Sequence, residues 1–330
     1  MWMRAAVVRD GRLVLEKVAM PRPGSYDLLV KVHAAGLNRA DLGVAAGARH
    51  GSFGGPGTIP GLEWAGTVEE TGAEVRDFAH GDRVMCSGLG AYADYAIVDA
   101  RRAMPIPEGI DFVTAATLPV ALQTMHDAVV TNGGLRPGET IMVQGASSGV
   151  GLMGLQVAAL TGASVVIGTS GNAERRSRLT NFGATHAIDT TQPDWPDAVR
   201  DATGGRGVDV IIDQVAGPMM NANLAAAAIK GRIVNVGRLG GITGPFDFDL
   251  HALKRIAYVG VTFRTRTIDE IAEINARVRA DLWDAVSGGQ LRLPIAAQFP
   301  LEAVEDALAL MRTNCHFGKI VLKTECGAGA

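Results

Sequence analysis

Residues 140–154, Thr-Ile-Met-Val-Gln-Gly-Ala-Ser-Ser-Gly-Val-Gly-Leu-Met-Gly, decide the fold of this 330-residue chain. An apolar strand pattern leads into glycines spaced Gly149-x-Gly151-x-x-Gly154 at the start of an apolar helix pattern. Glycines at these positions allow a tight turn, a close backbone approach to a pyrophosphate and close packing of helix on sheet. The N–H groups at the helix N-terminus attract phosphates. The stretch therefore predicts a dinucleotide-binding turn.

Strand and helix patterns alternate from this stretch onward. The expected strands are 140–144, 164–168, 186–188, 208–213, 231–236 and 256–261, and the expected helices are 150–161, 173–181, 194–202, 217–228 and 248–254. Strands that alternate with helices form a parallel sheet. We expect an α/β domain over residues 123–263 with a doubly wound, parallel, six-stranded sheet.

The segments on either side of residues 123–263 show a different secondary-structure pattern. Residues 1–122 contain short β-like runs, such as 28–32 and 95–98, between Gly- and Pro-rich turns. Residues 264–330 carry helical patterns at 269–286 and after Pro300, and a last strand at 319–322. We expect a mostly β domain over residues 1–122 that is completed by residues 264–330.

Composition narrows the class of partner. The chain has 31 Lys and Arg against 34 Asp and Glu, and its basic residues are scattered, which argues against nucleic acid. The N-terminal apolar run meets Arg9 and Asp10 too early for a signal peptide, and no run of about 18 apolar residues predicts a membrane span. The three cysteines lack the spacing of a disulfide framework or a zinc site. We expect a cytoplasmic protein with a small-molecule partner, and neither nucleic acid nor membrane.

The end of the second expected strand bears on the choice of cofactor. In NAD-binding domains an acidic residue about 20 residues after the fingerprint holds the ribose 2′-hydroxyl. Residues 168–176 read Gly-Thr-Ser-Gly-Asn-Ala-Glu-Arg-Arg, with no carboxylate at the strand end. Hydroxyl, amide and guanidinium groups there suit a 2′-phosphate. The candidate phosphate contacts are Thr169, Ser170, Gly171, Asn172 and Arg175. We therefore expect NADPH, with Arg176 and Arg178 on a solvated helix face.

Further motifs follow one another along almost the whole chain. They include Ala-Ala-Gly-Leu-Asn-Arg-Ala-Asp at 34–41, Pro-Gly-Leu-Glu-Trp-Ala-Gly at 60–66 and His-Phe-Gly-Lys-Ile-Val-Leu at 316–322, besides 81–84, 90–95, 118–124 and 231–237. Together they resemble the medium-chain dehydrogenase/reductase superfamily, in its zinc-independent quinone oxidoreductase branch. The resemblance implies a GroES-like catalytic domain, a Rossmann domain, and a homodimer joined along the last Rossmann strand.

The resemblance also implies the absence of a metal. Zinc-dependent relatives carry cysteine where this chain has Asn38, and histidine where it has Leu62 beside Glu63. A zinc site needs about four nitrogen, sulfur or oxygen donors, so the loss of both leaves too few.

The family's site residues are carried over position by position. Asn38 is expected to contact the nicotinamide ribose or the substrate, and Thr124 to lie beside the nicotinamide. The alternatives are a turn residue for Asn38, a helix residue that bonds its own backbone for Thr124, and a core residue for Phe263. The other cofactor contacts that the resemblance implies are Ser147, Ser148, Gly149, Val150, Gly151, Gly237, Arg238, Leu239, Phe263, Arg264 and Lys319.

The expected chemistry is hydride transfer from NADPH to a quinone, without zinc. Many relatives carry Arg-x-Gly-x-Tyr after the first motif, but residues 45–53 lack that tyrosine, so the substrate cannot be copied from the family. Arg49, His50 or Phe53 would line the pocket instead, and His50 is a hypothetical proton donor. Two alternatives remain: reduction of an α,β-unsaturated ketone or aldehyde on the same scaffold, and a non-catalytic NADPH-binding protein.

Overall fold

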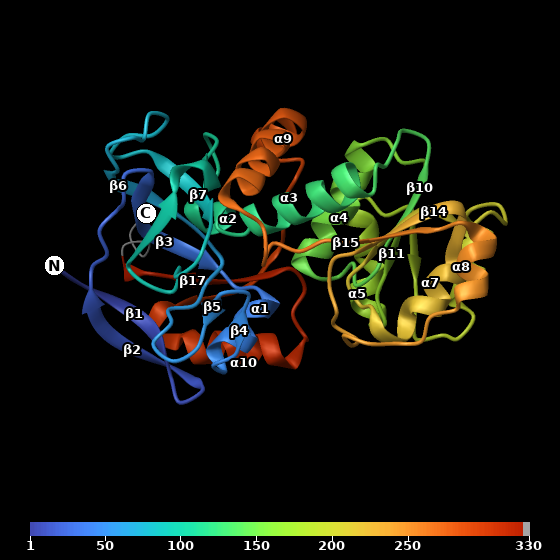
Figure 1. Cartoon of the computed structure of the whole chain (residues 1–330), viewed down its shortest axis with the longest axis horizontal. Coiled ribbons are helices and arrows are strands. Elements are labelled where there is room, and N and C mark those ends of the chain that lie inside the picture. Colours follow the sequence, from blue (N-terminus) through green and yellow to red (C-terminus); the bar gives the residue numbers. More distant parts are fainter. Residues whose placement is uncertain (326–330) are drawn as a thin grey trace. The chain divides into compact units, whose positions relative to one another are not determined.

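The computed structural model describes residues 1–325, which divide into two compact units. One unit consists of Met1–Val120 and the segment that begins at Phe263, and the other consists of Ala121–Thr262. Figure 1 shows the elements of both, coloured along the sequence. The middle of the chain therefore forms one body, and its two ends form the other.

The unit of Ala121–Thr262 contains a six-stranded sheet in which every neighbouring pair of strands is parallel. The strand order is β12-β11-β10-β13-β14-β15. These strands are β10 (Thr140–Val143), β11 (Val165–Thr169), β12 (His186–Ile188), β13 (Val208–Asp213), β14 (Ala227–Asn235) and β15 (Ala257–Gly260). The doubly wound α/β fold expected from the sequence is confirmed, and its two halves meet between β10 and β13.

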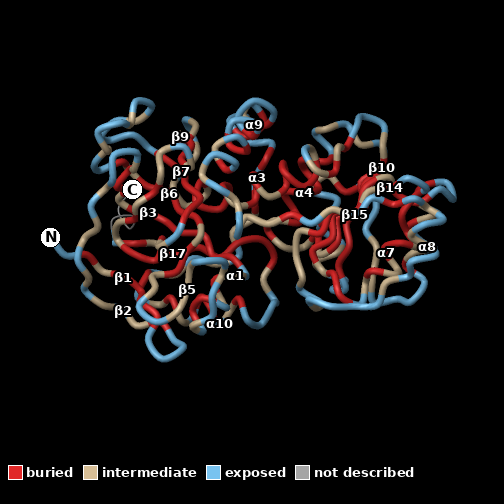
Figure 2. The backbone as a smooth tube through the Cα atoms, in the orientation of Figure 1, coloured by how far each residue is buried: buried red, intermediate tan, exposed pale blue. Residues whose placement is uncertain are grey.

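Helices cover both faces of this sheet. Ile167 of β11 shares a core with Trp195 and Leu224 on one face, whereas a Cβ on the next residue, Gly168, would meet Leu155 on the other. The inner strands β10, β11 and β13 are mostly buried, as expected for a sheet covered on both faces, and Figure 2 shows buried segments within this unit. The helices of this unit are α4 (Gly149–Leu160), α5 (Ala173–Ser177), α6 (Trp195–Ala202), α7 (Met220–Ala226) and α8 (Phe248–Lys254), preceded by α3 (Pro119–Met125) and the π-helix η2 (His126–Asn132).

Two expected helices are shorter than the sequence pattern predicts. The helix expected over 173–181 is α5 followed by a 3-10 turn, Leu179–Phe182, because the buried first residue of that turn packs into the core. The helix expected over 217–228 gives way to β14 at Ala227, which pairs with Val208 ahead of a register shift in the two strands. In both places a tertiary contact overrides the local pattern.

The other unit contains a seven-stranded, mostly antiparallel sheet. Its order is β16-β17-β3-β6-β7-β9, and β8 also pairs with β3. The strands are β3 (Asp27–Gly36), β6 (Glu63–Thr71), β7 (Arg83–Ser87), β8 (Tyr95–Asp99), β9 (Ala103–Pro105), β16 (Ile295–Pro300) and β17 (Lys319–Lys323). Two hairpins, β1–β2 (Trp2–Arg9, Arg12–Ala19) and β4–β5 (Arg49–His50, Phe53–Gly54), and the helices α1 (Arg39–Ala45), α2 (Phe112–Ala115), α9 (Ile268–Ser287) and α10 (Val304–Thr313) complete it. The expected mostly β, GroES-like domain is confirmed.

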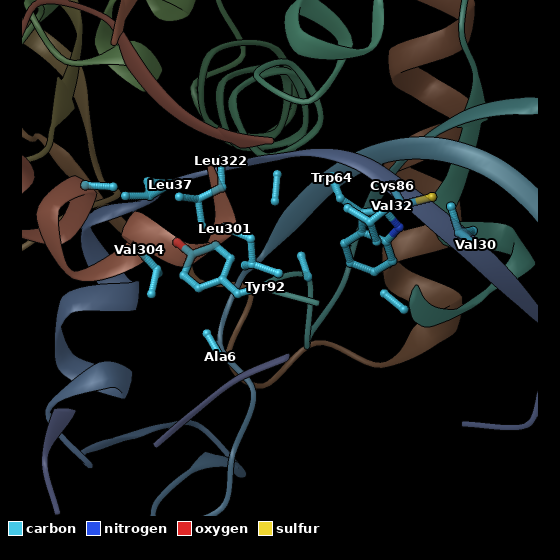
Figure 3. Packing of buried hydrophobic residues seen from close by; sticks show 14 of the residues in the cluster. Ala6, Val30, Val32, Leu37, Trp64, Cys86, Tyr92, Leu301, Val304 and Leu322 are labelled. Carbon is cyan, nitrogen blue, oxygen red and sulfur yellow. The ribbon is translucent and has the colours of Figure 1, made fainter. Parts of the chain in front are cut away.

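The core of this unit is built around two aromatic rings. Figure 3 shows Trp64 and Tyr92 among the buried side chains, with Val304 of α10 close to Tyr92. Both rings are fully buried. A Cβ on Gly88 would collide with the Trp64 ring, so only glycine fits at that position. This packing fixes the strand ends that carry the polar residues of the unit.

Candidate functional site

The glycine-rich turn between β10 and α4 is closed by one serine. The Ser148 hydroxyl donates to the Gly145 carbonyl at 3.0 Å and accepts the Gly151 N–H at 3.0 Å, which caps α4. A Cβ on Gly151 would lie 2.6 Å from the Gly145 oxygen and 2.7 Å from Cα of Ala146. Gly151 is therefore required for the helix to start this close to the strand. The turn presents the first amides of a 12-residue helix, which suits a pyrophosphate.

The structure brings the end of β11 against this turn. The Thr169 hydroxyl accepts the Gly145 N–H at 3.2 Å, and the Ser170 and Ser147 hydroxyls lie 3.2 Å apart. Asn172 caps α5 by accepting the Arg175 N–H at 2.9 Å. The residues expected to bind the pyrophosphate and those expected to bind the 2′-phosphate thus form one hydrogen-bonded surface.

A carboxylate that the sequence analysis missed lies beside this surface. The Ser170 N–H donates to the carbonyl of Ile188, the last residue of β12, so the next residue, Asp189, lies next to the end of β11. Nη1 of Arg176 is 3.0 Å from Oδ2 of Asp189 and 2.8 Å from the Ser170 carbonyl. Arg176 is thus ion-paired rather than on a solvated face as expected. The parallel pairing of the second and third strands was the signal that would have found Asp189.

The loops after β13 and β14 are locked to each other by backbone bonds. Gly237 donates to the Asp213 carbonyl at 3.2 Å and Leu239 donates to the Gln214 carbonyl at 3.2 Å. A Cβ on Gly237 would lie 2.6 Å from the Gln214 oxygen. Arg238 is half-buried and Leu239 is exposed. The loop expected near a nicotinamide carboxamide therefore has a fixed backbone with accessible side chains.

A buried polar cluster occupies the other unit, and we call it the Glu63 cluster. Asn38 caps α1, and Asp41 lies within that helix. Glu63 begins β6, Tyr92 lies between β7 and β8, and Lys319 begins β17. All five are at most 8% exposed. The sequence singled out Asn38 and Lys319 as cofactor contacts, and the structure brings these two together.

Glu63 and Lys319 are saturated with partners. Oε1 of Glu63 accepts from Lys319 Nζ at 2.5 Å and from Asn38 Nδ2 at 2.9 Å, while Oε2 accepts the Val120 N–H at 2.9 Å. The Lys319 ammonium also donates to the Leu37 carbonyl at 2.8 Å and to Oδ1 of Asn38 at 3.1 Å. Its three N–H groups therefore have three acceptors. The network fixes which way the Asn38 amide points.

Asp41 carries the uncompensated charge of the cluster. Its Oδ2 accepts the Asn38 N–H at 2.7 Å and the Tyr92 hydroxyl at 2.8 Å, but Oδ1 has no hydrogen-bond partner among residues 1–325. Burial raises the pKa of Asp41 to about 6, and burial together with this carboxylate raises the pKa of Tyr92. The carboxyl group can therefore hold a proton in mildly acidic solution.

Three further candidates, His50, Phe263 and Thr124, lie at half-buried positions. His50 pairs with Phe53 in the β4–β5 hairpin, and its pKa is lowered by burial and by Arg264, so the imidazole is mainly neutral at pH 7. The guanidinium carbon of Arg266 lies 5.6 Å from the centre of the Phe263 ring. Phe263 is half-buried rather than part of the core. Thr124 is half-buried in α3 of the other unit.

Two features are absent from residues 1–325: a cluster that could bind a metal ion and a helix that could span a membrane. No group of three or more His, Cys, Asp or Glu side chains there is arranged to hold a metal ion. No helix in the same range is long and apolar enough to cross a membrane.

Comparisons with known proteins agree with this architecture. Residues 24–108 match the family described as alcohol dehydrogenase GroES-like domain, and residues 149–278 match the one described as zinc-binding dehydrogenase. Quinone oxidoreductase of Rattus norvegicus is 30% identical over 309 residues, which covers 92% of this chain and 91% of that protein. Fold and sequence together define an oxidoreductase.

Two solved structures extend the comparison. An NAD-dependent alcohol dehydrogenase superimposes with a TM-score of 0.84 at 28% identity, over 97% of this chain and 99% of the other. A mycobacterial protein complexed with NADPH gives 0.85 at 26%, over 97% and 99%. The chain belongs to the medium-chain dehydrogenase/reductase superfamily, in its quinone oxidoreductase branch.

Proposed function

We propose that the protein is an NADPH-dependent reductase that delivers hydride to a quinone, or to a similar activated carbonyl or alkene, without zinc. The observation that carries the proposal is the Glu63 cluster. At the position of a relative's zinc ligand stands Asn38, bonded to a carboxylate that an ammonium already neutralises.

The donor set does not fit zinc. Leu62 has no donor atom, and Glu63 accepts three hydrogen bonds, one of them from Lys319. A cation at Glu63 would have to displace the ammonium, whose own burial requires that partner.

The residues of the other unit fit a dinucleotide. The Cβ-free turn at Gly151 and the capped start of α4 would hold the pyrophosphate, and Ser170, Asn172 and Arg175 would hold the adenosine end. Gly237, Arg238 and Leu239, which follow the fifth strand, would face the nicotinamide end. A superimposable relative that binds NADPH supports this assignment.

When bound, the reduced nicotinamide supplies the hydride. The chain binds and orients the nucleotide and the substrate, and it excludes water from them. The chemistry depends mostly on this placement, because a quinone or enone spreads the incoming negative charge over its oxygen. The amide of Asn38, oriented by its bonds to Glu63 and Lys319, would contact a ribose hydroxyl. His50, in its neutral form, would donate a hydrogen bond from a ring N–H to the substrate oxygen, and water would supply the proton that completes the reduction.

A homodimer in the cytoplasm belongs to the same proposal. β15 is the edge strand of the six-stranded sheet, and its Tyr258 is 44% exposed. The unpaired edge strand of a sheet can pair with the same strand of a second copy across a twofold axis, so that one sheet runs through both chains. Light scattering on a size-exclusion column would test it, and a monomer at all concentrations would contradict it.

The function is tested by steady-state oxidation of NADPH with a panel of quinones and of α,β-unsaturated ketones and aldehydes, with zinc measured in the same preparation. We expect the highest kcat/KM with a quinone, activity that chelators do not reduce, and no stoichiometric zinc. Preference for enones would reassign the substrate, whereas tight NADPH binding without turnover on either panel would indicate a binding protein. About one zinc per chain would overturn the metal-free mechanism.

A further inference from the structure

The Arg176–Asp189 ion pair joins three segments at one edge of the six-stranded sheet. Nη1 of Arg176, in α5, reaches the Ser170 carbonyl after β11 and the Asp189 carboxylate after β12. The Ser170 hydroxyl in turn lies 3.2 Å from the hydroxyl of Ser147 in the glycine-rich turn. The pair is thus connected by hydrogen bonds to the expected phosphate surface.

Dinucleotide-binding domains contact the adenosine ribose at this edge of the sheet. In NAD-binding domains a carboxylate at the end of the second strand bonds the 2′-hydroxyl. Here β11 ends without one, but its neighbour β12 supplies Asp189 beside Ser170, because the two strands are parallel and in register from Ile167 opposite His186 to Thr169 opposite Ile188. A negative charge therefore lies close to the site that would receive either a hydroxyl or a phosphate.

Asp189 is held in its ionised form. Oδ1 accepts the Thr191 N–H at 3.0 Å and the Thr191 hydroxyl at 2.7 Å, while Oδ2 faces Arg176. These bonds and the guanidinium lower the pKa of Asp189. One nitrogen of the guanidinium, Nη1, serves both the Ser170 carbonyl and the Asp189 carboxylate, so the carboxylate fixes the orientation of Arg176.

We propose that the Arg176–Asp189 pair sets the selectivity between NADPH and NADH, with Arg176 positioning the loop at Ser170 and Asp189 limiting the preference for the 2′-phosphate. The inference rests on the nicotinamide nucleotide site proposed above. A 2′-phosphate is repelled by Asp189 and competes with it for Arg176, whereas a 2′-hydroxyl is uncharged and can donate to it.

The test is the ratio of dissociation constants, Kd(NADH)/Kd(NADPH), measured by fluorescence titration at one salt concentration. Asp189→Asn keeps the acceptor for Thr191 and removes the charge, so we expect the ratio to rise roughly tenfold. Arg176→Gln removes the positive partner and leaves Asp189 exposed to the phosphate, so we expect the ratio to fall by a similar factor. In the double variant the two effects should partly cancel.

A matched control is available in the same unit. Arg232, in β14, and Glu139, directly before β10, form a pair at 2.7 Å. Their side chains are 21% and 25% exposed, close to the 22% and 22% of Arg176 and Asp189. Arg232→Gln should leave the ratio unchanged. Thermal unfolding of each variant verifies that the fold is kept.

The outcomes separate cleanly. A ratio within about twofold of wild type in Asp189→Asn, or equal weakening of both nucleotides, would overturn the selectivity role. Wild-type protein that binds neither nucleotide would refute the proposed function itself. Wild type that prefers NADH would refute only the assignment of NADPH, and the shift of the ratio in Asp189→Asn would still decide the role of the pair.

Discussion

Nζ of Lys319 lies 2.5 Å from Oε1 of Glu63, and the two side chains are 4% and 0% exposed. Removing one partner of a buried ion pair leaves an uncompensated charge and typically costs about 3–5 kcal/mol. Lys319→Met should therefore lower the free energy of unfolding by this amount. The double variant Lys319→Met/Glu63→Gln should recover part of the loss. Urea unfolding of wild type, both single variants and the double variant gives the coupling energy, and additive losses would show that the two groups act independently.

Asp41 makes stability depend on pH in an unusual direction for a carboxyl group. Its pKa is raised to about 6 in the folded protein from 3.8, so the folded state retains a proton that the unfolded state releases. The contribution of Asp41 is therefore most favourable below pH 4 and is lost as pH rises to about 6, by up to about 3 kcal/mol. Asp41→Asn removes this dependence. The difference in unfolding free energy between wild type and variant, measured from pH 4 to 7, should change in this direction; a constant difference would contradict the assignment.

Gly151 permits α4 to begin close to β10. Gly151→Val should abolish binding of NADPH, because its Cβ would collide with the Gly145 oxygen and the Ala146 backbone. The other unit should stay folded. Gly260→Ala is the control, since a Cβ there would meet no heavy atom within 4 Å. Unchanged NADPH titration in Gly151→Val would sink this interpretation of the turn.

Arg175 is the third residue of α5, the helix that follows the second strand of the sheet. If its guanidinium binds a 2′-phosphate, Arg175→Ala should weaken NADPH by roughly tenfold to a hundredfold and NADH much less. The helix N-terminus and the loop before it would still attract the phosphate, so the preference should shrink without necessarily reversing. Dissociation constants for both nucleotides decide the matter. Equal weakening of the two would mean that Arg175 has a structural role only.

Ala216 has a backbone conformation that glycine adopts more easily, with φ 56° and ψ −149°. Its N–H donates to Oδ1 of Asp213 at 2.8 Å, and this bond holds the loop after β13 in that shape. Ala216→Gly should raise the free energy of unfolding by about 1 kcal/mol, because relief of strain exceeds the entropy that glycine adds to the unfolded chain. Chemical denaturation measures the change, and a loss of stability would show that the strain is smaller than the entropic cost of glycine.

Most of the parallel sheet could be predicted because each strand–turn–helix unit has a local pattern. The fingerprint turn and all six strands lie where the sequence indicated, with shifts of a few residues at their ends. The Arg176–Asp189 pair could not be found in this way, because it depends on which strand lies beside β11. Glu63 and Lys319 both stood in recognised motifs, but 256 residues separate them, and no local pattern shows that the ammonium turns inward to meet the carboxylate.

The position of Lys319 on β17 has a consequence for biosynthesis. This strand lies between β16 and β3, and its ammonium is the positive partner of Glu63 in the cluster. During translation the ribosome synthesises the entire Rossmann unit before β17 emerges. Until then Glu63 and Asp41 cannot be buried without a large desolvation cost. We therefore expect the N-terminal sheet to complete its core only after β17 has been synthesised, and a chain that stops before residue 319 to lack the partner that Glu63 requires.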